Sequence, residues 1–169
     1  MKVVVNDANL LIDIVKLEMV TVFFQLDLAF YTTDLVYGEV NEAQAQYLQP
    51  YVDEGILRVE RLTTEEIVEL YEKTSTIRNL SDNDLSAFLL AQKRQGILLT
   101  SDNCFRKYAR DSEQEVHGHL WVLDILVEGQ IITPAKASDL LRRLCDEINP
   151  FLGLPAHECE KRHRRWSQQ

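Results

Sequence analysis

Apolar residues along this chain occur in two patterns that alternate from one end to the other. Short strand-forming runs at 2–5, 30–33 and 97–100 predict buried β-strands, whereas residues 10–15 and 85–91 place apolar side chains at helical spacing. Buried runs of this kind are typical of parallel sheets, whose strands are joined by helices. We therefore predict an α/β fold, a three-layer sandwich with a central mostly parallel sheet between helices.

Cap residues mark where the helices begin and end. Asp34 predicts the start of a helix that stops before Pro50. Ser81 predicts the start of another that Gly96 ends, and Thr133 followed by proline begins a third. The expected helices cover about 10–15, 34–49, 64–71, 81–95, 103–110, 124–129 and 133–149, with further strands at 55–62 and 119–123.

The chain is long enough for one domain with a sizeable core, because it has 169 residues of which 46% are hydrophobic. We expect that domain to span 1–149 and the stretch 150–169 to be an irregular basic tail. The net charge of −9 argues against a broad surface for nucleic acid. The tail is the exception, since residues 157–169 carry four basic side chains against two acidic ones. Two interpretations of the tail remain open: a solvated chain end and a segment that binds phosphate.

Cysteine usage and hydropathy favour a cytoplasmic location. Three cysteines at unpatterned spacing predict no disulfide framework, which fits a reducing compartment. The first residues lack the apolar core and cleavage site of a signal peptide. No apolar stretch approaches the roughly 20 residues that span a bilayer, so we expect no membrane segment.

Four acidic residues stand where strands end or helices begin: Asp7, Glu39, Asp84 and Asp102. Asp7 and Asp102 follow predicted strands, at the carboxyl edge of a parallel sheet where ligands bind. Glu39 borders the apolar stripe of the predicted helix 34–49 and has no basic partner at helical spacing. Carboxylates brought together there repel one another unless a divalent cation neutralises them. The pattern therefore predicts one acidic pocket that holds a metal ion.

Each acid also has an ordinary structural explanation. Asp7 and Asp102 can be N-caps that accept a backbone N–H, which is a common role of aspartate. Asp84 stands where a capping box places its third helical residue, and Asp82 in the same turn is its rival for the site. We favour Asp84 because it shares a helix face with apolar residues and is expected to point toward the protein interior.

These acids and their surroundings resemble the four acidic motifs of the PIN-domain nucleases. The resemblance rests on Val-Val-Val-Asn-Asp at Asp7, Val-Tyr-Gly-Glu-Val at Glu39, Leu-Ser-Asp-Asn-Asp-Leu at Asp84 and Leu-Leu-Thr-Ser-Asp at Asp102. The order and the intervals agree with the family, and the resemblance covers roughly 2–149. Within that family the chain is similar in size to VapC-type toxins of bacterial toxin–antitoxin pairs.

The resemblance implies a metal-dependent endoribonuclease. Mg²⁺ or Mn²⁺ would be held by Asp7, Asp84 and Asp102, with Glu39 on a second ion or a bound water, and would activate a water to attack the phosphodiester. Neighbouring side chains are candidates to orient these acids, although turn and cap hydrogen bonding is their commoner role: Asn9, Thr100, Ser101 and Asp82. Basic side chains on the helix after Asp102 are candidates for RNA phosphates, with a solvated helix face as the alternative: Arg106, Lys107 and Arg110.

The resemblance also implies partners, namely an RNA substrate, an antitoxin if the chain is a toxin, and a second copy in a homodimer. Two other functions stay open. One is a catalytically inactive PIN-like module that binds protein. The other is an Asp-dependent phosphotransfer protein, which needs a lysine near the end of a later strand to bind phosphate. The predicted strand 119–123 is followed by Asp124 instead.

Overall fold

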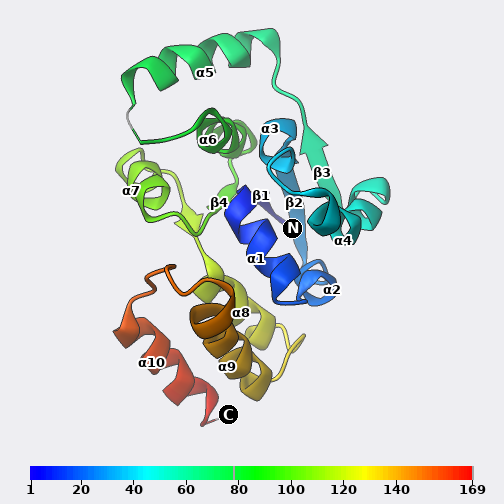
Figure 1. Cartoon of the computed structure of the whole chain (residues 1–169), viewed down its shortest axis with the longest axis vertical. Coiled ribbons are helices and arrows are strands. Elements are labelled where there is room, and N and C mark those ends of the chain that lie inside the picture. Colours follow the sequence, from blue (N-terminus) through cyan, green and yellow to red (C-terminus); the bar gives the residue numbers. More distant parts are fainter. Residues whose placement is uncertain (78, 169) are drawn as a thin grey trace.

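Within residues 1–77 and 79–168, which the computed structural model describes, five parallel strands form one sheet in the order β3-β2-β1-β4-β5 (Figure 1). The strands are β1 (Lys2–Asn6), β2 (Leu28–Thr33), β3 (Leu57–Glu60), β4 (Ile97–Leu99) and β5 (Val116–His117). The chain builds outward from β1 to one side and then returns to add β4 and β5 on the other. The strand order therefore reverses between β1 and β4, and sheets of this kind bind ligands beyond the carboxyl ends of the strands at that point.

Helices join the strands and continue past the last one. They are α1 (Ala8–Lys16), α2 (Val20–Phe23), α3 (Asp34–Tyr37), α4 (Glu42–Asp53), α5 (Thr64–Thr76), α6 (Asp82–Arg94), α7 (Asn103–Asp111), α8 (His119–Glu128), α9 (Pro134–Arg143), the π-helical turn η1 (Leu144–Ile148) and α10 (Ala156–Trp166). Figure 1 shows α5 at one end of the molecule and α9 with α10 at the other. Over the described residues, none of these helices combines the length and the apolar character needed to cross a lipid bilayer.

Successive residues along each strand alternate between two apolar cores, one on each face of the sheet. Val4 and Phe30 belong to the core to which α1, α2, α8 and α9 contribute. Val5 and Tyr31 belong to the core to which α3, α6 and α7 contribute. This alternation follows from the two-residue period of a β-strand. The predicted three-layer α/β sandwich is confirmed.

Gly96 is required by a close approach between strands, and the helix ends one residue before it. The left-handed residue that closes α6 is Gln95, with φ of 49°. A Cβ at Gly96 would lie 2.8 Å from the Val3 side chain and 3.0 Å from its carbonyl oxygen. Glycine therefore lets the chain enter β4 directly against β1. The prediction that Gly96 is the C-cap of the helix was wrong, because Gln95 has that role.

The predicted helix 34–49 is two helices. Thr33 is the N-cap of α3, so the assignment of Asp34 as the cap was wrong. Asn41 then caps α4 in a reciprocal capping box with Gln44. This capping box starts a new helix within the segment that was predicted as one continuous helix. The second helix continues through Pro50 to Asp53.

The predicted strand at 119–123 is the first half of α8. The edge strand of the sheet is β5, which lies directly before it, and Gly118 is the N-cap of the helix. Val122, Leu123, Leu126 and Val127 are buried, which is a helical spacing. A short apolar run reads equally well as a strand or as a buried helix, and here the run continues long enough for the helix.

The stretch 150–169 is not irregular over its described part, because α10 covers Ala156–Trp166 and packs on α9. Trp166 is 3% exposed and belongs to the main core. Two arginines of α10 pair with the buried Asp124 of α8: Arg162 Nη2 lies 2.8 Å from the carboxylate, and Arg165 also contacts it. Part of the basic charge of the tail therefore holds the helix in place.

We predict that Asp124→Asn lowers the free energy of unfolding by about 1–3 kcal/mol, because two guanidinium groups lose a buried charged partner. Asp139→Asn is the matched control, since Asp139 pairs with Arg142 at 3.0 Å on an exposed surface and is expected to change stability by less than about 1 kcal/mol. Urea denaturation of both variants measures the difference. Equal effects would show that the Asp124 pairs do not hold α10.

Candidate active site

Asp7 is the most deeply buried acid of the predicted quartet, with 1% of its surface exposed. It follows β1 and caps α1, and its Oδ1 accepts a 2.7 Å hydrogen bond from the Ala8 N–H. Its Oδ2 accepts a 2.7 Å bond from the hydroxyl of Thr100, just beyond β4. The Asp7 N–H donates to the carbonyl of Leu99 at 2.9 Å. The acid is therefore fixed at the point where the strand order reverses.

Thr100 connects two of the predicted acids. Besides donating to Asp7, its Oγ1 accepts a 3.1 Å bond from the Asp102 N–H. Asp102 caps α7 by accepting from the Phe105 N–H at 2.6 Å and is itself exposed. Thr100 thus orients the Asp7 carboxylate, one of the two roles that the sequence left open for it.

Asp84 is partly buried and forms the capping box of α6. Its Oδ2 accepts from both the backbone N–H of Ser81 at 2.7 Å and the Ser81 hydroxyl at 2.8 Å. The capping box that the sequence offered as the structural explanation of Asp84 is therefore formed, and the residue is still only partly exposed. Asp82 in the same turn accepts a 3.0 Å bond from the Thr74 hydroxyl of α5. The two acids therefore have different partners.

Glu39 lies in the turn after α3 and not in a helix. The prediction that it borders the apolar stripe of a helix was therefore wrong. Glu39 is exposed, and its Oε1 accepts a 2.6 Å hydrogen bond from Asn83 Nδ2 of α6. Sequence reasoning missed Asn83 as its partner. The available signal was the position of Asn83 between Asp82 and Asp84, in the first turn of a helix that begins at the site.

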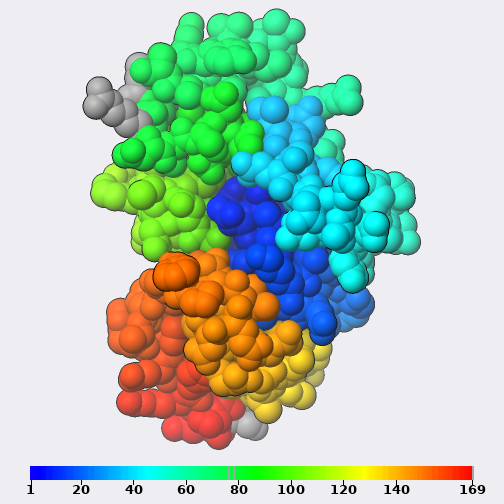
Figure 2. All heavy atoms as spheres, viewed as in Figure 1, coloured from blue at the N-terminus to red at the C-terminus, as the bar shows by residue number. Residues whose placement is uncertain are grey.

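Electrostatics couple three of the four acids. Burial, and after it the charges of Asp84 and Glu39, raise the pKa of Asp7 from its ordinary value of 3.8 to about 7, against the hydrogen bonds from Thr100 and Ala8, which lower it. Asp84 and Glu39 therefore lie within electrostatic reach of Asp7. Figure 2 shows the blue atoms of the first residues in the middle of the molecule, framed by green, cyan and orange segments.

The donor types at this site fit a hard divalent cation, because Mg²⁺ and Mn²⁺ prefer carboxylate oxygens. Among the residues that the structure describes, however, no group of three or more His, Cys, Asp or Glu side chains is placed to hold a metal ion. Asp84, Asp102 and Glu39 each have an oxygen engaged by a protein donor. The structure therefore brings Asp84 and Glu39 within electrostatic reach of Asp7, but the described residues do not assemble the predicted metal-binding cluster.

The other predicted residues divide between two cavities. Asn9 and Ser101 line a cavity of about 280 Å³ together with Asp102. Arg106 and Arg110 line a separate cavity of about 470 Å³. The third basic residue proposed for RNA, Lys107, is 75% exposed in its side chain and pairs with Asp111 one turn later.

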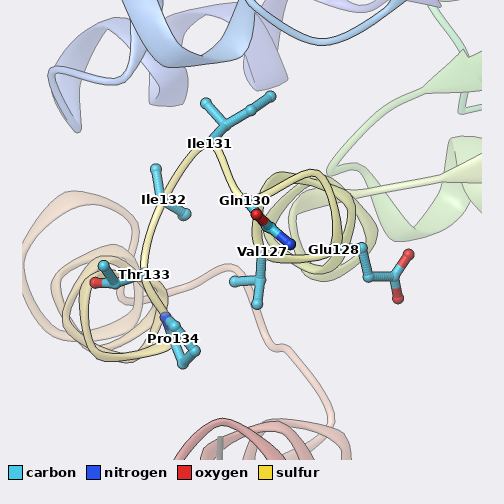
Figure 3. A pocket seen from close by; sticks show the side chains of 7 residues that line it. All are labelled: Val127, Glu128, Gln130, Ile131, Ile132, Thr133 and Pro134. Carbon is cyan, nitrogen blue, oxygen red and sulfur yellow. The ribbon is translucent and has the colours of Figure 1, made fainter.

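A further cavity, of about 510 Å³, lies away from this chemistry. Its walls come from the end of α8, the turn after it and the start of α9, and Glu128 is the one carboxylate that Figure 3 shows there. No predicted site residue lines it. We therefore place the candidate active site at the carboxyl edge of β1 and β4.

We predict that the metal-free protein loses stability as pH rises from about 4 to 7, because ionising Asp7 costs more in the folded than in the unfolded chain. The raised pKa corresponds to a loss on the order of 4 kcal/mol above pH 7. Asp7→Asn, measured by thermal unfolding with chelator present, is expected to be more stable than the parent at pH 8 and to lose this advantage at pH 4. The exposed Glu39→Gln serves as the control and is expected to gain far less. An Asp7→Asn advantage that does not depend on pH would contradict the assigned cause.

Comparison with known proteins agrees with the geometry. A search of curated proteins found no match. A family model described as a PIN domain matches residues 3–153, which include all four acids, β1 to β5 and the helices up to η1. The chain therefore belongs to the PIN-domain family, whose members are generally nucleases.

Proposed function

We propose that this protein is a divalent-metal-dependent endoribonuclease that hydrolyses RNA phosphodiesters. The observation that carries the proposal is the Asp7 carboxylate, which is buried at the carboxyl edge of β1 and β4 with its pKa raised to about 7 and lies within electrostatic reach of Asp84 and Glu39. A buried acid among like charges is costly in a purely structural role. It is useful where a cation binds, since the cation removes that repulsion.

Mg²⁺ or Mn²⁺ would be held by Asp7, Asp84 and Asp102, with Glu39 as a further ligand or as the partner of a bound water. When bound, such an ion supplies Lewis-acid stabilisation of the phosphoryl oxygens and lowers the pKa of a water molecule. The chain itself orients the donors. The Thr100 hydroxyl fixes Asp7 Oδ2 at 2.7 Å, and Asn83 fixes Glu39 Oε1 at 2.6 Å.

The environment of Asp7 disfavours the phosphotransfer alternative. A nucleophilic aspartate must reach the phosphorus atom, whereas Asp7 is 1% exposed and both of its oxygens accept hydrogen bonds. The segment 119–123 is helical and not a strand, so the residue that follows it does not bear on this alternative. The inactive binding module remains the competing proposal, and metal-dependent cleavage separates it from a nuclease.

The toxin role is the finer part of the proposal. The family and the size of the chain are consistent with the toxin of a toxin–antitoxin pair, for which the partner would be an antitoxin protein. The positively charged residues Arg106 and Arg110 lie beyond Asp102 on α7, next to the proposed site, which favours a polyanionic substrate in spite of the net charge of −9.

We predict that the protein cleaves labelled single-stranded RNA with Mn²⁺ and that a chelator stops the reaction. Asp7→Asn is expected to lower the rate by about 100-fold or more, because it removes a charged donor at the centre of the site. Asp82→Asn is the matched control, since Asp82 lies in the same helical turn as Asp84 but contacts Thr74. Its rate is expected to stay within about threefold of the parent. Full activity of Asp7→Asn would exclude Asp7 as a ligand.

We also predict that Mn²⁺ raises the melting temperature in a concentration-dependent way. A cation that binds only the folded state stabilises it by about 2.7 kcal/mol at 100 times its Kd. The shift is expected to vanish in Asp7→Asn and to persist in Asp82→Asn, as followed by differential scanning fluorimetry. Indifference of the parent protein to millimolar Mn²⁺ would favour the binding-module alternative.

A further inference from the structure

A second cavity lies beside the acidic site and has the opposite charge. Its volume is about 470 Å³, and its walls come from α7, the end of β5, the start of α8 and the segment 153–162. This volume is within the range of small-ligand sites. The residues that matter for its chemistry are Arg106, Arg110, His117, Gly118 and Trp121.

Arg106 is a partly buried cation, and part of its guanidinium group has no hydrogen-bond partner. Its Nε is buried and has no hydrogen-bond partner, and neither Arg106 nor Arg110 forms an ion pair with an acid within the described part of the chain. Burial, and after it the charge of Arg110, lowers the pKa of Arg106. A buried donor left unsatisfied is destabilising, and an anion beside this guanidinium would offset the cost of its burial.

Gly118 provides the room that this guanidinium occupies. A Cβ there would lie 2.8 Å from Arg106 Nη1, so a side chain at this position would displace the guanidinium from the backbone at the start of α8. Gly118 is also the N-cap of that helix and forms no side-chain cap hydrogen bond. A guanidinium next to the positive end of a helix is repelled, and an anion between them is favourable to both.

Two aromatic side chains form part of the wall of the same cavity. The rings of His117 and Trp121 are stacked, with centroids 4.7 Å apart and planes 10° from parallel. Both residues line the cavity. Flat aromatic side chains of this kind bind nucleic-acid bases by stacking.

The remaining charges of the cavity are already paired with each other. Arg162 donates to Glu158 at 2.6 Å and to Asp124 at 2.9 Å. Glu158 therefore does not neutralise the two arginines of α7. The cavity keeps an excess of positive charge next to an aromatic surface, which is the combination that a nucleotide requires.

We propose that this cavity binds one phosphorylated nucleotide unit, with its phosphate at Arg106 and Arg110 and its base against Trp121 and His117. The cavity adjoins the acids, because Asn103 borders both cavities and the carbonyl of Thr100 lies 3.1 Å from the position of a Cβ on Gly118. Resting on the proposed function, the unit is a nucleotide that flanks the cleaved bond of an RNA strand. A free mononucleotide is the other source of the same chemistry.

The first test is binding of adenosine 5′-monophosphate to the full chain in chelator, where no cleavage occurs. Saturable quenching of tryptophan fluorescence is expected. Arg106→Gln and the exposed Arg110→Gln are each expected to weaken the affinity at least about tenfold, and Trp121→Leu to abolish most of the quenching. Arg164→Gln is the matched control, because Arg164 lies on α10 outside the cavity and is 78% exposed in its side chain. It is expected to bind like the parent.

Inorganic phosphate is expected to compete with the nucleotide, and adenosine without phosphate to bind more weakly. Thermal unfolding of every variant checks the fold, and Arg110→Gln keeps the test valid if Arg106→Gln unfolds. Absence of saturable binding, or equal binding by the Arg110→Gln and Arg164→Gln variants, would overturn the proposal.

The second test separates this site from the nuclease activity. A short single-stranded RNA in chelator is expected to bind more than about tenfold tighter than the mononucleotide, and Arg110→Gln to weaken both. With Mn²⁺ the same variant is expected to raise KM for RNA and leave kcat within about threefold. Mononucleotide binding without any RNA cleavage would contradict the proposed nuclease activity but support the nucleotide-binding site. RNA that binds no tighter than the mononucleotide would overturn the assignment to an RNA strand.

Discussion

The pair of hydrogen bonds that holds the Asp7 carboxylate is the constraint on which the site depends. One oxygen accepts from the first N–H of α1, and the other accepts from the hydroxyl of Thr100, 93 residues further along the chain. The Asp7 N–H also extends the pairing of β1 with β4 to Leu99. The same residue therefore caps a helix and joins the ends of two central strands.

This arrangement concentrates opposite charges on two sides of one sheet edge. Asp7, Asp84 and Glu39 raise the negative potential on one side, and each is oriented by a hydrogen bond from a protein neighbour. Arg106 and Arg110 line the cavity on the other side, behind Gly118. Under the proposed function, a phosphodiester strand with metal ions would match both groups of charges, because the ions would neutralise the acids while the arginines would contact neighbouring phosphates.

Two segments show why local pattern is insufficient for the last third of the chain. The run 119–123 has the composition of a strand, but it is followed by more buried apolar residues and preceded by β5, which already forms the sheet edge. The tail has the composition of a solvated end. In the structure, Arg162 and Arg165 pair with Asp124, which lies 38 and 41 residues earlier in the sequence, and Trp166 packs in the main core.

The sequence by itself determined the alternation of strands and helices, the parallel character of the sheet and the identity of four acids at element ends. These features depend on burial periodicity and on cap residues, which act within a few positions of the chain. Only the tertiary structure decided that Asp7 is coupled to Asp84 and Glu39, that Thr100 holds it, and that Arg106 and Arg110 share a cavity with Trp121. Those relations depend on strand register and on the rotation of each helix about its axis. Both are fixed by packing between residues far apart in the sequence.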